Sequence, residues 1–222
     1  MPAPSPEGLT VVVPCRDEAG NLPSLLAELR AALRDALPDA HEILVVDDGS
    51  ADGTAEVAAA AARGDPRVRI LRHDRNRGMG AAVRTGAAEA AHPWILVCPG
   101  DGQFDPSEIP SFLARRDGHD LVLGIREGRN DGAKRRAISR ANRLLLRILF
   151  GLRLRDPSWV KLFRTDLARR AAWEADRFFW ETEILARARA AGARFAEVPS
   201  RQRPRRSGRS SAGTWGAATA TA

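Results

Sequence analysis

Residues 9–18 read LTVVVPCRDE and residues 42–50 read EILVVDDGS, two apolar runs that each end in charged side chains. Both runs are rich in β-branched residues, which is typical of strands that are buried on both faces. Strands of this kind occur in parallel sheets, whose consecutive strands are joined by helices. The two stretches therefore predict an α/β fold with acidic residues at the carboxyl ends of its strands.

Strand and helix patterns alternate through the first half of the chain. Strands are expected at Leu9–Pro14, Glu42–Asp47, Val68–Arg72, Trp94–Cys98 and Leu121–Gly124. Helices are expected between them and after them, at Asn21–Ala36, Asp52–Arg63, Gly80–Ala91 and Pro106–Arg116. This order predicts a mostly parallel, Rossmann-like sheet with helices on both faces.

The pattern changes after Arg126. The sequence predicts a basic amphipathic helix, a short apolar segment, two further helices and a last strand, at Lys134–Phe150, Trp159–Arg164, Leu167–Ala175, Glu181–Ala191 and Phe195–Pro199. Residues from about 202 to 222 are rich in Arg, Ser, Gly and Ala. We expect this last segment to be flexible unless a ligand orders it, because it has little apolar surface to bury.

The composition suits one globular domain with its own core, since 44% of the 222 residues are hydrophobic and 28% are charged. The chain has only two cysteines, so no disulfide framework is expected and a reducing compartment is the default. We find neither a signal-peptide pattern nor a run of about 18 apolar residues. These features predict a cytoplasmic location.

The positive charge is unevenly distributed. The formal net charge is +7, and residues 126–209 hold about two thirds of the Lys and Arg residues but only about a third of the acids. Nucleic acid, an anionic membrane or a phosphorylated substrate could each explain this basic half, as could a solvated arginine surface. Binding to single-stranded nucleic acid would favour aromatic residues interleaved with the basic ones. The five tryptophans are scattered, so we expect no nucleic-acid partner.

Polar clusters follow three of the expected strands. In open α/β sheets, ligands bind beyond the carboxyl ends of the strands. Adjacent carboxylates are costly unless a cation or a hydrogen-bond donor faces them, and a base, a ribose or a metal-bound diphosphate could do so. The residues concerned are Pro14, Asp17 and Glu18, then Asp47 and Asp48, and then Asp101 and Gln103.

A glycine segment, Gly78 and Gly80, opens the third helix. A helix N-terminus with small residues can approach a phosphate or a sugar. The segment is neither the Gly-x-Gly-x-x-Gly dinucleotide fingerprint nor a P-loop. It therefore counts against a dehydrogenase or a P-loop nucleotidase.

These segments together resemble the family 2 glycosyltransferases with the GT-A fold, and more closely their dolichol- or polyprenyl-phosphate sugar synthase branch. The blocks that carry the resemblance are, in order, VVVPCRDEAGN, VVDDGSADGT, NRGMGAAVRTG, GDGQFDP and EVPSRQRPRRSGRSS. The resemblance implies one GT-A domain over residues 1–211, with the nucleotide sugar held by residues 1–125. Residues 126–211 would face the acceptor and the membrane, and residues 212–222 would form a flexible tail.

The resemblance also implies residue roles. Donor binding falls on Pro14, Asp17, Glu18, Asp47, Asp48, Gly78, Gly80 and Asp101. Asp101 and Arg126 are the expected catalytic residues, and Asp101 and Gln103 the expected ligands of a divalent cation, Mg²⁺ or Mn²⁺. Binding of the acceptor phosphate falls on Arg136, Ser139, Lys161, Arg205 and Arg206.

The metal block departs from the family pattern at Pro99, which replaces the first of two acids. Affinity for a hard cation depends on the number and charge of its oxygen ligands. We therefore expect weak metal binding without the donor, whose diphosphate can supply the missing oxygens. Loss of catalysis, leaving a protein that only binds a nucleotide sugar, is the alternative.

The implied activity is inverting transfer of a sugar from a nucleoside diphosphate sugar to a polyprenyl phosphate, at the cytoplasmic face of a membrane. A phosphate oxygen is already an anion and can attack without a general base. Transfer to the hydroxyl of a glycan or glycolipid would need a base, and the sequence offers no unambiguous one. We expect the four histidines to be surface residues without a catalytic or metal-binding role.

The basic helix expected at Lys134–Phe150 has two interpretations. Its apolar residues and its arginines fall on different faces, as in helices that lie on an anionic membrane. A helix packed on the sheet with solvated arginines would show the same pattern. The two arrangements are compatible, because the arginine face stays free in both.

Overall fold

The first strand, β1 (Leu9–Cys15), is buried along its whole length inside a seven-stranded sheet. The structure is a computed structural model that describes residues 8–127, 133–177 and 179–207, without the side chains of residues 133–136. β1 pairs in parallel with β2 (His41–Asp47) and with β4 (Trp94–Val97), and β2 pairs in parallel with β3 (Val68–Arg72). Burial on both faces explains why these strands are continuous apolar runs.

The second half of the chain extends the same sheet. β6 (Lys161–Arg164) is antiparallel to both β4 and β5 (Leu121–Glu127), and β7 (Phe195–Arg201) runs parallel to β5. The strand order is β3-β2-β1-β4-β6-β5-β7. The predicted mostly parallel α/β sheet is therefore confirmed, and the short apolar segment after Trp159 is its antiparallel strand.

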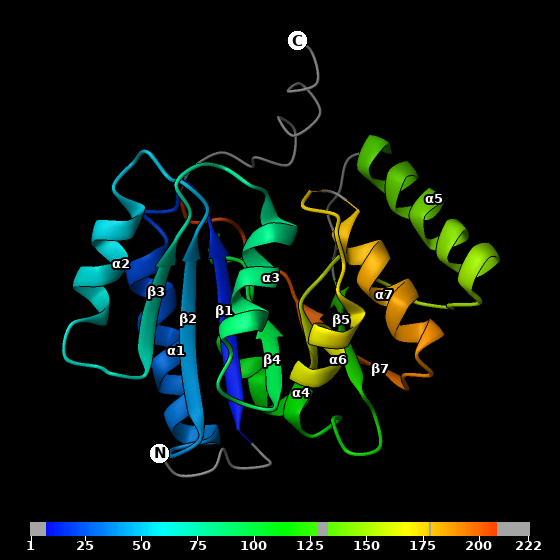
Figure 1. Cartoon of the computed structure of the whole chain (residues 1–222), viewed down its shortest axis with the longest axis horizontal. Helices are drawn as coiled ribbons and strands as arrows, with labels where there is room; N and C mark the ends of the chain where they lie inside the picture. The colour runs from blue at the N-terminus through cyan, green and yellow to red at the C-terminus, as the bar shows by residue number, and fades with distance from the viewer. Residues whose placement is uncertain (1–7, 128–132, 178, 208–222) are drawn as a thin grey trace.

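Helices cover both faces of the sheet (Figure 1). One face is covered by α1 (Leu22–Ala36) with α4 (Ile109–Leu113), whose side chains form a core with Val11 and Val13 of β1. Val12 points to the other face, where it packs with α3 (Met79–Glu89), α6 (Thr165–Ala171) and α7 (Trp180–Ala190). The remaining described helices are α2 (Thr54–Ala62), the 3₁₀ turn Pro106–Glu108 and α5 (Ala133–Phe150).

Several element boundaries differ from the sequence prediction. The helix expected over Pro106–Arg116 begins as the 3₁₀ turn and ends at Leu113. The helix expected at Leu167–Ala175 ends at Ala171, because Ala172 adopts a left-handed conformation with φ of 43°. β5 continues three residues past Gly124 because β7 pairs with it as far as Glu127. Such pairing partners are not visible to local sequence patterns.

The expectation of a flexible segment after residue 202 is wrong for residues 202–207, here called the C-terminal strap. Arg203 forms ion pairs with Glu28 at 2.6 Å and with Asp105 at 2.7 Å. Its backbone N–H donates to the carbonyl of Gln103 at 2.8 Å, and Arg206 pairs with Glu28 at 2.5 Å. The strap is ordered because the folded surface presents acids to its arginines. The tail expected at residues 212–222 lies outside the described residues.

Gly86 is the point where α3 lies against β1. A Cβ added there would lie 2.4 Å from Cγ1 of Val12, which is fully buried. We expect Gly86→Val to lower the free energy of unfolding by about 1–3 kcal/mol, because overpacking forces side chains or backbone to shift. Urea unfolding followed by tryptophan fluorescence measures this change. Ala88→Ser, on the exposed side of the same helix, should change stability by less than about 0.5 kcal/mol. A Gly86→Val protein as stable as the wild type would contradict the close contact.

Candidate functional site

The polar clusters after β1, β2 and β4 meet at one edge of the sheet. The backbone N–H of Asp48 donates to the carbonyl of Cys15 at 2.9 Å, and that of Gly100 donates to the carbonyl of Pro14 at 3.0 Å. These bonds hold the three loops side by side. The structure thus brings together the strand ends that the sequence predicts as the donor site, although the roles of individual residues stay predictions.

The first and second loops are cross-linked by hydrogen bonds. Asp17, which has a left-handed φ of 54°, donates its backbone N–H to Ser50 Oγ at 2.9 Å and accepts from the backbone N–H of Ala51 at 3.0 Å. Asp47 is fully buried, accepts from the backbone N–H of Ser50 at 3.0 Å and lies 3.3 Å from Arg72 Nε. Both predicted donor-binding carboxylates therefore also shape the loops that carry them.

Asp48 is the centre of a buried hydrogen-bond network. One oxygen, Oδ1, lies 2.7 Å from His73 Nδ1 and accepts from the backbone N–H of Arg77 at 2.8 Å. The other, Oδ2, accepts from the backbone N–H of Gly78 at 2.7 Å. The Asp48 side chain thereby fixes the loop between β3 and α3.

The expectation that all four histidines are surface residues is wrong for His73 and His41, which are each 6% exposed. His73 also contacts Thr85 Oγ1 through Nε2 at 3.0 Å. It follows β3 directly, as Asp48 follows β2, and β2 and β3 are paired with Asp47 opposite Arg72. Pairing of these two predicted strands in register was the signal that could have placed His73 beside Asp48.

Gly78 and Gly80 allow a second loop to reach the beginning of α3. A Cβ on Gly78, whose φ is 105°, would lie 2.4 Å from the carbonyl oxygen of Asp176, and one on Gly80 would lie 2.2 Å from that of Ala175. The backbone N–H of Gly80 donates to the carbonyl of Asp176 at 2.7 Å. The first turn of α3 is therefore closed by protein backbone, and contact of these glycines with a donor stays a prediction.

The predicted metal block offers oxygen ligands of the right kind but few of them. Asp101 is 22% exposed at its side chain and accepts from the backbone N–H of Gln103 at 3.1 Å. The side-chain amide of Gln103 donates to the carbonyl of Arg203 at 3.4 Å. Nowhere in residues 8–127, 133–177 and 179–207 do three His, Cys, Asp or Glu side chains group as a metal site would require. These two residues fit Mg²⁺ or Mn²⁺ only if other oxygens, such as those of a diphosphate, complete the shell.

Arg205 of the C-terminal strap lies between two acids of this site. Its guanidinium pairs with Glu18 and lies 3.9 Å from Asp101 Oδ2. Burial raises the pKa of the Glu18 carboxyl, and the hydrogen bond from Asn21 at 2.5 Å and the Arg205 charge oppose this rise. The strap thus supplies a positive charge to the acids predicted to hold the donor and the metal.

Two of the predicted site cations, the catalytic candidate Arg126 and the acceptor candidate Lys161, are buried in ion pairs. Arg126 donates to both carboxylate oxygens of Asp156, at 2.7 and 2.8 Å, and its guanidinium lies 5.0 Å from the ring centre of Trp159. Lys161 is 1% exposed, and its ammonium group lies 2.5 Å from Glu181 and 2.8 Å from the carbonyl of Trp159. Breaking such pairs would leave a buried charge uncompensated, so they stabilise this geometry.

The other predicted acceptor residues are spread over the second half. Ser139 lies half-buried on α5, and Arg206 pairs with Glu28. The side chain of Arg136 lies outside the described residues. The structure therefore does not bring Arg206 to the same place as Lys161, and the acceptor site stays a prediction.

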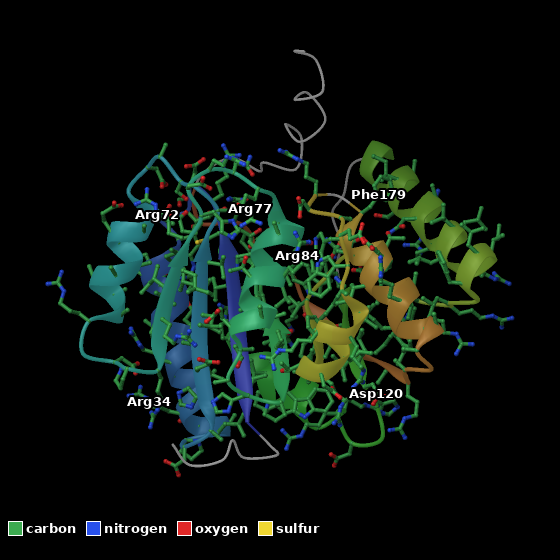
Figure 2. The ribbon with its side chains drawn as sticks, viewed as in Figure 1. Arg34, Arg72, Arg77, Arg84, Asp120 and Phe179 are labelled. Atoms are coloured by element: carbon green, nitrogen blue, oxygen red, sulfur yellow. The ribbon has the colours of Figure 1, made fainter. Side chains whose placement is uncertain are left out.

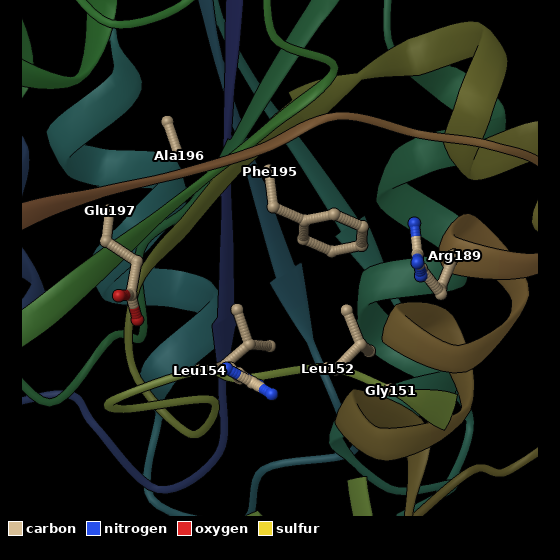
Figure 3. A pocket seen from close by; sticks show the side chains of 8 residues that line it. Gly151, Leu152, Leu154, Arg189, Phe195, Ala196 and Glu197 are labelled. Atoms are coloured by element: carbon tan, nitrogen blue, oxygen red, sulfur yellow. The ribbon is translucent and has the colours of Figure 1, made fainter. Parts of the chain in front are cut away.

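A cavity of about 310 Å³ lies away from these residues (Figure 3). It is lined by Gly151, Leu152, Arg153, Leu154, Arg189, Phe195, Ala196 and Glu197. Phe195 begins β7, and the donor residues follow the carboxyl ends of the parallel strands. This cavity is therefore at the opposite end of the sheet from the candidate site.

Comparison with known proteins agrees with this geometry. Residues 10–175 match the family model described as "Glycosyl transferase family 2". An undecaprenyl-phosphate mannosyltransferase of Micrococcus luteus is 32% identical over 202 residues, which cover 85% of this chain and 80% of that protein. An undecaprenyl-phosphate 4-deoxy-4-formamido-L-arabinose transferase of Pseudomonas paraeruginosa is 37% identical over 150 residues, 67% of this chain. The match spans 44% of that second relative, less than half of its length.

Solved structures share the fold. The glucosyl-3-phosphoglycerate synthase of Mycobacterium tuberculosis, crystallised with Mn²⁺, UDP and glucosyl-3-phosphoglycerate, superposes with a TM-score of 0.73 at 21% identity. The match covers 95% of this chain and 75% of that one. The mannosyl-3-phosphoglycerate synthase of Rubrobacter xylanophilus gives a TM-score of 0.73 at 19% identity, over 92% of this chain and 72% of that one. At these identities the likeness concerns the fold alone.

The Asp48 network can be tested by replacing one oxygen. In Asp48→Asn, an NH₂ group faces at least one of the former donors, so one buried N–H loses its acceptor. We expect a loss of about 1.5–3 kcal/mol in the free energy of unfolding, the usual worth of a hydrogen bond to a charged group. Hydrogen exchange should also accelerate at the amides of Arg77 and Gly78. The control is Asp74→Asn, an exposed carboxylate in the same loop. Unchanged exchange at the two amides would show that Asp48 does not hold the loop.

Proposed function

Since this chain belongs to glycosyl transferase family 2, we propose that it moves a sugar from a nucleoside diphosphate sugar to a polyprenyl phosphate, with inversion at the anomeric carbon. The observation that carries the proposal is the likeness to an undecaprenyl-phosphate mannosyltransferase over 80% of that protein's length. A second relative is also named as an undecaprenyl-phosphate sugar transferase. The meeting of the strand-end acids at one edge of the sheet supports a donor site there.

The site supports a division of roles between donor and acceptor. The donor would lie across the ends of β1, β2 and β4, with its diphosphate toward Asp101 and the strap. A divalent cation held by Asp101, Gln103 and the diphosphate would neutralise charge on the leaving group. Arg205 lies 3.9 Å from Asp101 and adds a second positive charge at the same place. Asp101 would therefore hold the cation, and Arg205 would balance charge as the diphosphate departs.

A phosphate acceptor suits this site better than a hydroxyl acceptor. A hydroxyl must lose its proton to a base as it attacks. The Glu181 carboxylate at the start of α7 is not free to act as such a base, because it is already bonded to the Lys161 ammonium group at 2.5 Å. A phosphate monoester brings its own anionic oxygen and needs no such base.

The helix α5 supports a peripheral contact with the membrane. It packs on α7 through Leu146, which is buried, and through a hydrogen bond of 3.0 Å from Thr182 to Asn142. This leaves a set of large apolar side chains exposed, namely Ile138, Leu144, Leu145, Ile148, Leu149 and Phe150. None of the helices in the described part of the chain has the length and hydropathy to cross a bilayer. We propose that α5 lies on an anionic membrane, at the cytoplasmic face, with its apolar residues inserted and its arginines at the headgroups.

The catalytic assignment is tested by replacing Asp101. Asp101→Asn should reduce sugar transfer to undecaprenyl phosphate by at least about a hundredfold, the usual cost of removing one electrostatic stabiliser of a transition state. A screen of nucleoside diphosphate sugars with labelled sugar, with and without Mn²⁺, identifies the donor and measures turnover. Asp117→Asn, an exposed acid on a distant turn, should keep wild-type activity. More than about a tenth of wild-type turnover in Asp101→Asn would refute the assignment, and the absence of transfer with every donor would refute the function.

The membrane contact is tested on the exposed face of α5. We expect the double substitution Ile148→Ser and Leu149→Ser to weaken binding to vesicles that contain an anionic lipid by at least about tenfold. The variant lacks two large apolar side chains whose transfer from water into the membrane favours binding. Co-sedimentation with vesicles measures the change, and circular dichroism checks that the helix content is kept. Wild-type protein should bind neutral vesicles less tightly than anionic ones. Equal binding by the wild type and the double variant would mean that α5 does not face the lipid.

A further inference from the structure

A cavity of about 650 Å³ lies beside the first turn of α3, and neither the sequence motifs nor the comparisons assign it. Two segments nearly one hundred residues apart line it, namely Arg75, Asn76 and Arg77 on one side and Ala175, Asp176, Arg177 and Phe179 on the other. Figure 2 shows Arg77 and Phe179 at the same edge of the molecule, on either side of the end of α3. The cavity therefore opens at the edge where the strand ends meet.

Polar contacts hold both walls of this cavity. Asp48 accepts from the backbone N–H groups of Arg77 and Gly78. On the other wall, Arg84 of α3 donates to the carbonyl of Trp173 at 3.1 Å and pairs with Asp176. Gly78 has no side chain, so Arg177 passes directly over it, with its Cγ 3.0 Å from the position of a Cβ. The two walls are thus built features of the fold.

The cavity carries positive charge that the protein does not neutralise. In the described part of the chain, the guanidinium groups of Arg77 and Arg177 form no ion pair or hydrogen bond, while Asp176 is already paired with Arg84. Arg126, Lys161 and the strap arginines are all paired with acids. Among the described cations, Arg77 and Arg177 of the cavity are therefore unpaired, whereas Arg126, Lys161, Arg205 and Arg206 are not.

The chemistry of the lining fits a phosphate group attached to an apolar chain. Two guanidinium groups can bind phosphate oxygens through charge-assisted hydrogen bonds. Asn76 also lines the cavity. Phe179 is 64% exposed and lies three residues before Thr182, which bonds to Asn142 of α5. An apolar chain leaving the cavity over Phe179 would reach the helix whose apolar side chains are exposed.

We propose that this cavity binds the phosphate monoester of the acceptor, through Arg77 and Arg177, with the first part of the polyprenyl chain on Phe179. The proposal rests on the proposed function, since it names the place where the acceptor of that reaction binds. It separates the acceptor phosphate from the acids of the donor site, whose negative charge would repel that phosphate. Arg77 and Arg177 are then specificity residues for a charged lipid.

Binding of a short, soluble acceptor tests the assignment. Geranyl phosphate is titrated calorimetrically into the full chain and into Arg77→Gln, Arg177→Gln and the double variant. Each single substitution should weaken binding by about tenfold, which is about 1.4 kcal/mol, and the double substitution by more. Arg34→Gln, at the far end of α1 in Figure 2, is the matched control and should bind as the wild type does. Geraniol, which has no phosphate, should bind weakly to all of these proteins.

Two binding results would overturn the proposal. One is a double variant that binds geranyl phosphate within twofold of the wild type. The other is an equal loss of affinity for UDP or GDP, because the cavity would then hold the phosphates of the donor. Sugar transfer by the same proteins separates this proposal from the proposed function. If the double variant transfers sugar as fast as the wild type, the acceptor site is refuted but the proposed function stands. If geranyl phosphate binds through the two arginines but no protein transfers sugar, the proposed function is refuted and the anion site stands.

Discussion

The site depends on one buried carboxylate, that of Asp48, which is 3% exposed. A charge removed from water must be met by donors inside the protein. Here the donors are the backbone N–H groups of Arg77 and Gly78, together with the ring of His73. Because these donors follow β3 and begin α3, Asp48 ties the end of β2 to the loop that reaches the second half of the sheet. Gly78 and Gly80, at the beginning of α3, lie against the backbone carbonyl of Asp176. This contact forms part of the wall of the cavity of about 650 Å³.

The positive charge of the second half is divided into paired and unpaired groups. Arg126 and Lys161 are buried and face Asp156 and Glu181, so their charges serve the internal geometry of β5 and β6. Pairs of this kind contribute less to net stability than their short distances suggest, because desolvation offsets the attraction. The unpaired guanidinium groups of Arg77 and Arg177 lie in loops. There they stay hydrated, and no desolvation cost arises until a ligand binds. Net charge along the sequence therefore does not distinguish cations paired inside the protein from cations that are free to meet a ligand.

The C-terminal strap relates the unusual metal block to the rest of the site. Pro99 removes one negative charge from the block, and Arg205 brings one positive charge to Glu18 and Asp101. Both features make the proposed donor site less negative, which would weaken its attraction for a cation and favour the arrival of a diphosphate. The strap is also held by Glu28 and Asp105, so this charge is positioned by the fold and not by a freely moving tail.

The sequence by itself determined the α/β class, the alternation of strands and helices and the strand ends that carry the acids, because these follow from local apolar periodicity. It also indicated the family through its ordered blocks. Only the tertiary structure decided that His73 is buried against Asp48, that residues 202–207 are ordered, and that Arg77 and Arg177 share a cavity. These depend on contacts between residues far apart in the chain, such as Arg205 with Glu18, and on which charges find partners. A local pattern records what a residue is, whereas burial and pairing depend on what the fold brings beside it.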